Sequence, residues 1–221
     1  KLCFSAVFAL DEQAKTHKQW FGKTIINSNK RFNYEEVQEI IESKKGEYAQ
    51  EILSLDKLAK ALRKKRFEKG SINFHSEEVK FILNEKAKPI GVYVKENTDS
   101  HQLIEDFMLL ANRKVAELIG KVSANKEAKA FVYRIHDQPL EEKINKFNEF
   151  IQKLGYNLQL NSRKHMVDSM NALFEQIEGK GEQNLIEQLA IRTMQRAIYS
   201  TQNIGHYGLA FKHYTHFTSP I

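Results

Sequence analysis

The segment 99–121, DSHQLIEDFMLLANRKVAELIGK, is the longest amphipathic stretch of the chain and constrains the fold most strongly. Its apolar residues recur every three or four positions, the spacing that gathers side chains on one face of an α-helix. They are Leu103, Phe107, Leu110, Ala111, Val115 and Leu118. One face of this helix must therefore be buried against other elements. We predict Asp99 as its cap, with Gln102 three residues on in a variant of the capping box.

Strand patterns are concentrated within residues 1–95. Residues 2–27 predict a hairpin around a polar turn, and the stretches VKFILNE and KPIGVYVKEN predict a second one. Between the hairpins, Asn33 is placed to cap a helix whose apolar spacing continues until Gly70.

Helices dominate the rest of the chain. A short strand at 130–137 precedes predicted helices at 140–155, 162–178 and 183–197, and Tyr207, Leu209 and Phe211 then alternate like a strand. No proline-rich linker or repeat divides the sequence. We therefore predict one α+β unit over residues 1–221, with antiparallel strands mainly in the N-terminal half and several packed helices. A sheet covered by helices is the simplest such architecture.

Composition excludes some classes of protein. Cys3 is the only cysteine, which excludes an internal disulfide framework and fits the reducing cytoplasm. No apolar run approaches the roughly 20 residues that span a bilayer, so we expect no membrane contact. The net charge of +6 favours a polyanionic partner.

The positive charge is concentrated in residues 56–70, DKLAKALRKKRFEKG. Such a helix is either a nucleic-acid-facing surface or a solvated face that keeps the chain in solution. The sequence pattern leaves both interpretations open.

Catalytic motifs are not evident from residue patterns. The aspartates are scattered singly, whereas two-metal phosphodiester chemistry needs a cluster of them. No nucleophile motif occurs. The histidines His206, His213 and His216 could ligate a transition metal, but no cysteine or carboxylate shares their segment at ligand spacing. The patterns alone indicate an α+β domain and leave nucleic-acid binding open.

Several strings nevertheless resemble the catalytic RNB domain of the ribonuclease R and ribonuclease II family. The most specific are IEDFMLLAN, at 104–112, and HYGLAFKHYTHFTSPI, at 206–221. Others are KLCFSAVF, WFGKTIINSNKRFNYEEVQEIIE and FVYRIHDQP. In order, the matching strings cover nearly the whole chain.

The resemblance implies a 3'-to-5' exoribonuclease that releases nucleoside monophosphates by magnesium-assisted hydrolysis. Its implied partner is the 3' end of single-stranded RNA, and no protein partner is implied. In the family, the metal-holding aspartates precede the stretch that matches Lys1, and an assisting arginine follows the position of Ile221. Residues 1–221 are therefore expected to be a central part of the domain. We expect them to bind no Mg²⁺ and to be inactive by themselves.

The resemblance also implies RNA-contacting residues. Phe74 matches an aromatic residue that stacks on bases, and Glu105 matches a glutamate at the terminal ribose. Asn112 lies two turns from Glu105 on the same helix face. Further candidates in the C-terminal segment are Tyr214, Thr218 and Ser219. The competing interpretations are that Phe74 is a core residue, that Glu105 is an ordinary surface glutamate, and that most of the C-terminal segment is core.

Two other functions remain open at the level of sequence. One is a non-catalytic RNA-binding module that uses the basic helix at 57–69. The other is a helical scaffold with no role in nucleic-acid binding.

Overall fold

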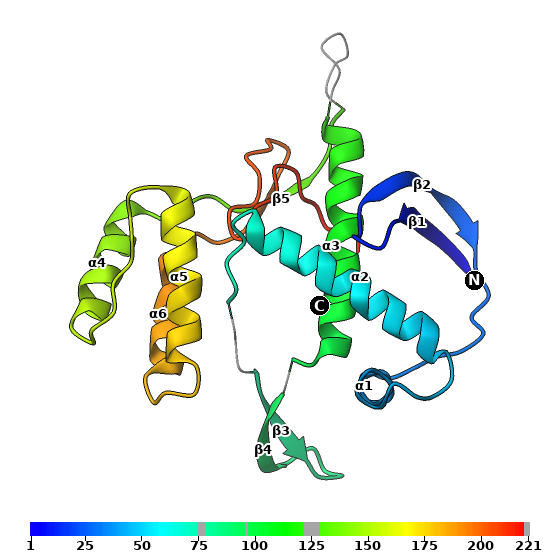
Figure 1. Ribbon diagram of the computed structural model, residues 1–221, viewed down its shortest axis with the longest axis horizontal. Helices are drawn as coiled ribbons and strands as arrows, with labels where there is room; N and C mark the ends of the chain where they lie inside the picture. The colour runs from blue at the N-terminus through cyan, green and yellow to red at the C-terminus, as the bar shows by residue number, and fades with distance from the viewer. Residues whose placement is uncertain (75–77, 96, 122–128, 219–221) are drawn as a thin grey trace.

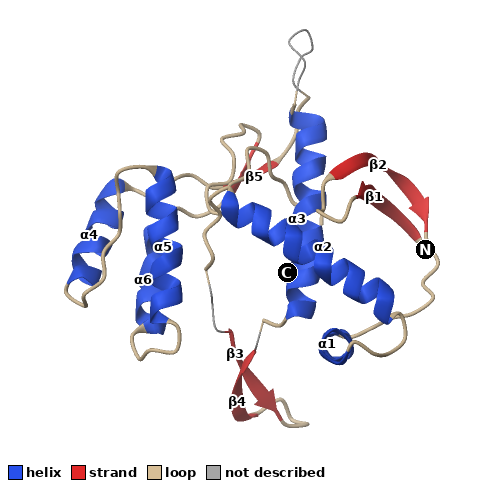
Figure 2. Ribbon diagram, viewed as in Figure 1, coloured by secondary structure: helices blue, strands red, loops and turns tan. Residues whose placement is uncertain are grey.

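The computed structural model describes residues 1–74, 78–95, 97–121 and 129–218. It confirms an α+β fold with strands mainly in the N-terminal half. Figure 2 shows that helices dominate and that the strands form short hairpins. The expectation of one sheet covered by helices is wrong. The described strands form three separate two-stranded antiparallel sheets, because each strand pairs with one partner only.

The first hairpin forms as predicted. Strand β1 (Leu2–Leu10) pairs with β2 (Thr16–Ile25). Its turn is closed by Asp11, whose Oδ1 accepts hydrogen bonds from the backbone N–H groups of Gln13 and Lys15 at 3.0 and 2.8 Å. This local bonding by aspartate is a common device for reversing a chain.

The predicted helix between the hairpins is two helices. Helix α1 (Tyr34–Ser43) begins at a capping box in which the side chain of Asn33 and the N3 glutamate bond each other's backbone N–H groups. Helix α2 (Ala49–Glu68) follows after a break. Gly46 lies in this break at φ 131°, a conformation that other residues rarely adopt, so the apolar spacing does not mark one continuous helix.

The second hairpin, β3 (Glu78–Leu83) and β4 (Pro89–Lys95), projects from the rest of the molecule in Figure 1. Helix α3 (Asp99–Gly120) follows it and crosses α2 near the centre of the molecule. The N-cap of α3 is Thr98, not Asp99, and the side chain of Thr98 makes no capping hydrogen bond to the backbone. Asp99 instead binds Lys60 of α2 at 2.9 Å, which replaces the predicted capping interaction by a contact between helices.

The C-terminal half contains the largest core. Helices α4 (Glu141–Gln152), α5 (Arg163–Ile177) and α6 (Gln183–Thr193) form a three-helix unit at one side of the molecule (Figure 1). Their buried side chains form a single apolar cluster that also takes in residues outside the helices. Its fully buried members are Ile151, Val167, Met170, Ile177, Ile186 and Ala190.

The three-helix unit is joined to the rest by irregular chain and a small sheet. Strand β5 (Tyr133–Ile135) pairs with β6 (Ile198–Ser200). Residues 207–211 do not form the strand that their alternation suggested. Phe211 of this segment is buried against Leu109 of α3, so its apolar character reflects packing. None of the described helices is long and apolar enough to cross a lipid bilayer.

Candidate functional site

A cavity of about 780 Å³ lies where α2, α3 and α5 approach one another. Its wall includes the residues that follow α2, the first turns of α3, part of α5 and the loop at 206–209. Phe74 and Glu105, two of the site residues inferred from the family resemblance, both line it. The tertiary structure therefore brings these two together, although different elements carry them.

The backbone that leads to Phe74 is held on both sides. The N–H of Ile72 donates to the carbonyl of Gly208 at 2.9 Å. The amide of Asn171 on α5 accepts from the N–H of Asn73 at 2.9 Å and donates to the carbonyl of Ser71 at 3.0 Å. These bonds fix the direction in which the next residue enters the cavity.

The ring of Phe74 combines two roles. Its centroid lies 5.7 Å from that of Phe174, and it packs against the apolar cluster of the three-helix unit. It also forms part of the cavity wall. The two interpretations of this residue are therefore compatible, since one face can support the core while the ring borders the open space. Its contact with RNA stays a prediction.

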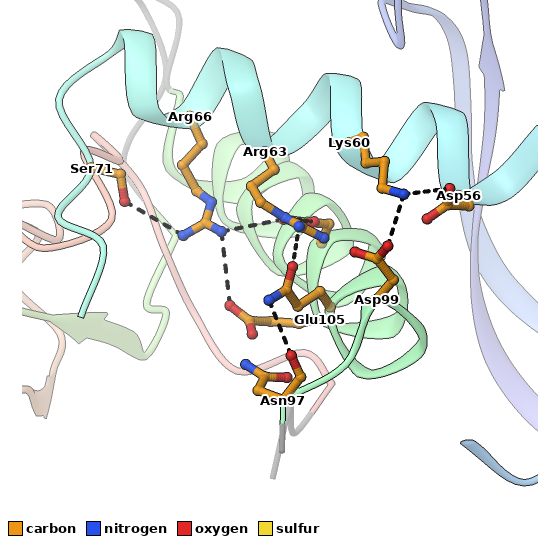
Figure 3. Close-up of polar contacts among 10 residues, drawn as sticks. Asp56, Lys60, Arg63, Arg66, Ser71, Asn97, Asp99 and Glu105 are labelled. Atoms are coloured by element: carbon orange, nitrogen blue, oxygen red, sulfur yellow. Dashed lines mark hydrogen bonds and ion pairs between the residues drawn. The ribbon is translucent and has the colours of Figure 1, made fainter. Parts of the chain in front are cut away.

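A buried ionic cluster joins α2 to α3 beside the cavity (Figure 3). The carboxylate of Asp106, whose side chain is 2% exposed, accepts from Nε of Arg63 at 2.9 Å and from Nη2 of Arg66 at 3.3 Å. Burial, the larger effect, raises the pKa of Asp106, although both guanidinium groups act to lower it. Arg66 also reaches the hydroxyl of Ser71 at 3.5 Å, so the cluster extends to the chain that carries Phe74.

Glu105 lies beside this ionic cluster and lines the cavity. Its side chain is 42% exposed, and Oε1 lies 3.9 Å from Nη2 of Arg66. Figure 3 shows it pointing toward Arg66 from α3. A carboxylate with this exposure can accept a hydrogen bond from a ligand while the arginine limits its orientation. Whether RNA contacts it stays a prediction.

The basic stretch of α2 is divided between two environments. Arg63 and Arg66 face α3 and are mostly buried, and Lys60 bridges Asp56 and Asp99 at 2.8 and 2.9 Å. The part exposed to solvent is reduced to a few lysines. They are Lys57, whose Nζ lies 3.7 Å from a carboxylate oxygen of Glu12, Lys64, and Lys69 at the C-cap. Neither a nucleic-acid surface nor a solvated face describes the whole stretch.

Asn112 lies on the same helix as Glu105 but is completely buried. Its Nδ2 donates to the carbonyl of Thr218 at 3.0 Å and to the hydroxyl of Tyr214 at 3.3 Å. Its Oδ1 accepts from the N–H of Thr218 at 2.7 Å and from its hydroxyl at 3.0 Å. The amide is thus fully used in holding this segment on α3.

The side-chain amide of Asn112 positions two other predicted site residues, Tyr214 and Thr218. Tyr214 is 3% exposed, and Thr218 is half-buried beside it. Neither they nor Asn112 line the cavity that contains Phe74. Ser219 lies outside the described residues. Direct contacts of these four residues with RNA stay predictions, and the geometry gives Asn112 a holding role instead.

Two histidines in the cavity wall were not inferred as site residues. Nε2 of His136 donates to the carbonyl of Gln195 at 2.9 Å, and its Nδ1 accepts from the N–H of Gly208 at 3.0 Å. The ring of His206 lies beside it and is tilted by 55°, with ring centroids 4.9 Å apart. Burial and the neighbouring positive charges lower the pKa of His206 to about 3, so it stays neutral at physiological pH. They lie in two of the strings that carry the family resemblance, 70 positions apart, and only the tertiary structure shows that they are in contact.

The described residues do not fit a magnesium ion. No group of three or more histidine, cysteine, aspartate or glutamate side chains among them converges as ligands would. Asp56, Asp99 and Asp106 are instead bound to cationic side chains. No step of a metal-assisted reaction is therefore assigned to these residues.

Comparison of structures shows that the fold of this chain occurs in other solved proteins. RNase R of Mycoplasma genitalium, in complex with ribose-methylated single-stranded RNA, matches the whole chain with a TM-score of 0.86 at 23% identity, over 34% of its own chain. Yeast Ssd1, a pseudonuclease, matches 99% of the chain with a TM-score of 0.70 at 21% identity, over 27% of its own chain. The fold alone therefore occurs both in a ribonuclease and in a pseudonuclease.

Comparison of sequences shows the family. The model of the RNB domain matches residues 1–221, and the chain therefore belongs to the RNB domain family. DIS3-like exonuclease 2 of Schizosaccharomyces pombe is 37% identical across the whole chain, which covers 26% of that protein. Ribonuclease R of Aquifex aeolicus is 33% identical across the whole chain, which covers 31% of that protein. The chain thus spans between a quarter and a third of these relatives.

Replacing Asn112 by alanine should lower the free energy of unfolding by about 3 kcal/mol. The substitution leaves the buried N–H of Thr218 and hydroxyl of Tyr214 without partners, and each such loss costs about 1–3 kcal/mol. Urea denaturation at neutral pH measures the change. The matched control is Asn145→Ala on the exposed face of α4, which should stay within about 0.5 kcal/mol of the native value. Equal effects of the two substitutions would contradict the holding role.

The lowered pKa of His206 predicts a loss of stability in acid. The unfolded chain binds a proton at this residue below pH 6.5, whereas the folded chain does so only near pH 3, so acidification between these values favours unfolding. The contribution is about 2 kcal/mol between pH 7.5 and pH 5. His206→Asn, which can still accept from the N–H of Leu209, should remove it, whereas His165→Asn on the surface should not. Urea denaturation at both pH values provides the comparison, and an unchanged pH dependence in His206→Asn would count against a buried neutral imidazole.

Proposed function

We propose that this chain is the part of a 3'-to-5' exoribonuclease that holds the 3' end of single-stranded RNA. The observation that carries the proposal is the shared cavity of Phe74 and Glu105. Membership of the RNB domain family supports it, as do relatives named Ribonuclease R and DIS3-like exonuclease 2. The structure of Mycoplasma genitalium RNase R with single-stranded RNA supports this choice of partner.

The proposed contacts follow from the chemistry of the cavity wall. A terminal base stacks on Phe74, an interaction worth about 1–3 kcal/mol that accepts any base. Glu105 accepts a hydrogen bond from a ribose hydroxyl, and DNA lacks the 2'-hydroxyl. The cavity is lined by four carboxylates and two arginines, the latter both bound to Asp106. Such a wall suits the uncharged hydroxyl groups of a terminal nucleoside better than its phosphates.

Hydrolysis to nucleoside monophosphates with Mg²⁺ is proposed for the natural protein that contains residues 1–221. The reducing cytoplasm is its proposed compartment, since Cys3 is the only cysteine of the chain. What the described residues contribute is binding and orientation of the RNA end. The groups that hold the metal are not assigned to them.

A second candidate function is RNA binding without catalysis. The structural likeness to the pseudonuclease Ssd1 favours it, because the same fold occurs there. The exposed lysines of α2 offer this alternative a surface, although Arg63 and Arg66 are withdrawn from it by Asp106. Incubating the natural protein with Mg²⁺ and a 5'-labelled RNA separates the two functions. Stepwise shortening from the 3' end supports the exoribonuclease, and intact RNA supports the binding module.

Replacing Phe74 by leucine should weaken binding of a 3'-accessible oligoribonucleotide by about 10-fold, because leucine fills the apolar volume but cannot stack on a base. Phe74→Tyr should restore the affinity. Fluorescence anisotropy with a labelled oligouridylate and the natural protein measures both. The matched control is Phe81→Leu on the exposed face of β3, which should bind as the native protein does. Native affinity in Phe74→Leu would remove the stacking role.

Replacing Glu105 by glutamine should reduce the preference for RNA over DNA by about 5-fold. Hydrogen bonds to a charged acceptor contribute about 1 kcal/mol more than those to a neutral one, and only RNA offers the 2'-hydroxyl. The measurement is the ratio of the dissociation constants for oligouridylate and oligodeoxyuridylate. Glu149→Gln, on the exposed surface of α4 and outside the cavity, is the control. An unchanged ratio in Glu105→Gln would show that another group recognises the sugar.

A further inference from the structure

A second cavity, of about 1060 Å³, adjoins the first. It is bordered by α4, α6 and the chain next to β5 and β6. Phe74 and His136 line both cavities, so the two spaces meet at these side chains. A ligand that reaches Phe74 from outside therefore has a second wall available, formed by the three-helix unit.

The two cavities differ in charge. The second is lined by three cationic side chains, Lys143, Arg192 and Arg196, and by one carboxylate, Asp137. All three cations are exposed, and none forms a salt bridge with a carboxylate in the part of the chain that the structure describes. In the first cavity, by contrast, carboxylates outnumber arginines. The electrostatic gradient thus runs from a basic space to an acidic one across Phe74.

We propose that the second cavity binds the phosphates of single-stranded RNA, upstream of the terminal nucleoside held in the first cavity. This inference rests on the proposed function. Each nucleotide carries one negative charge, and phosphates that meet lysine or arginine release bound counterions into solution. A single strand therefore gains by placing its phosphates beside Lys143, Arg192 and Arg196 and only its uncharged end among the carboxylates. Ile191, Ile198 and Ile204 supply apolar surface in the same wall for the faces of bases or sugars.

The cations of the second cavity are also better placed to bind phosphates than those of α2. The arginines of α2 are bound to Asp106, and Lys60 is bound to two aspartates. The cations of the second cavity have no such partners among the described residues, so they do not have to break an ion pair to meet a phosphate. The exposed lysines of α2 do not line either cavity.

The test compares two triple variants of the natural protein. The first carries Lys143→Gln, Arg192→Gln and Arg196→Gln. The control carries Lys57→Gln, Lys64→Gln and Lys69→Gln, which removes the same charge from exposed positions on α2. The probe is a fluorescein-labelled oligouridylate, and its dissociation constant is measured between 50 and 300 mM KCl. Each phosphate contact on a single strand contributes about 0.7 to the slope of log affinity against log salt.

The first variant should lower this slope by about 2, whereas the control should retain the native slope. Circular dichroism and urea denaturation confirm that both variants fold. A native slope in the first variant, or a lowered slope in the control alone, overturns the proposal and places the phosphates elsewhere. Phe74→Leu distinguishes this failure from that of the proposed function. If Phe74→Leu still weakens binding, the first cavity still holds the RNA end, and only the assignment of phosphates to the second cavity is wrong. Native binding in Phe74→Leu would instead contradict the proposed function itself.

Discussion

The contact on which the arrangement of this molecule depends is the carboxylate of Asp106, held between Arg63 and Arg66. It fixes the crossing of α2 and α3, since an unpaired charge at this depth costs several kcal/mol and both partners lie on the other helix. The chain that follows α2 leads directly to Phe74, and α3 carries Glu105. One ionic cluster therefore sets the positions of both residues at the cavity.

Hydrogen bonds between side chains and backbone fix the irregular segments that surround this ionic cluster. The described sheets are too small to organise the molecule, because each has two strands. Asn171 and Ser71 fix the segment before Phe74, and Asn112 fixes the C-terminal segment on α3. These amide and hydroxyl groups satisfy irregular backbone that would otherwise be buried without partners. The loop at 206–209 can therefore form a cavity wall without being part of a helix or strand.

The basic stretch of α2 shows how a charge pattern differs from a charged surface. Its arginines and lysines occur in one run, yet the arginines face a buried aspartate and only some of the lysines are free in the described structure. The cations of the second cavity come from α4, from α6 and from the chain just beyond α6. No run of basic residues marks them, and they become a surface only because the three-helix unit brings these segments together.

The sequence by itself determined the nature and approximate position of most elements, because helical and strand periodicity follow from backbone geometry over a few residues. It also indicated, through family resemblance, Phe74 and Glu105. Tertiary structure decided the separation of the hairpins, the holding role of Asn112 and the contact between His136 and His206. The physical reason is range: Arg63 meets Asp106 across 43 positions and Ser71 meets Gly208 across 137. Helical and strand periodicity gives no information about contacts between residues so far apart in the sequence. The walls of both cavities are formed by residues brought together through such contacts.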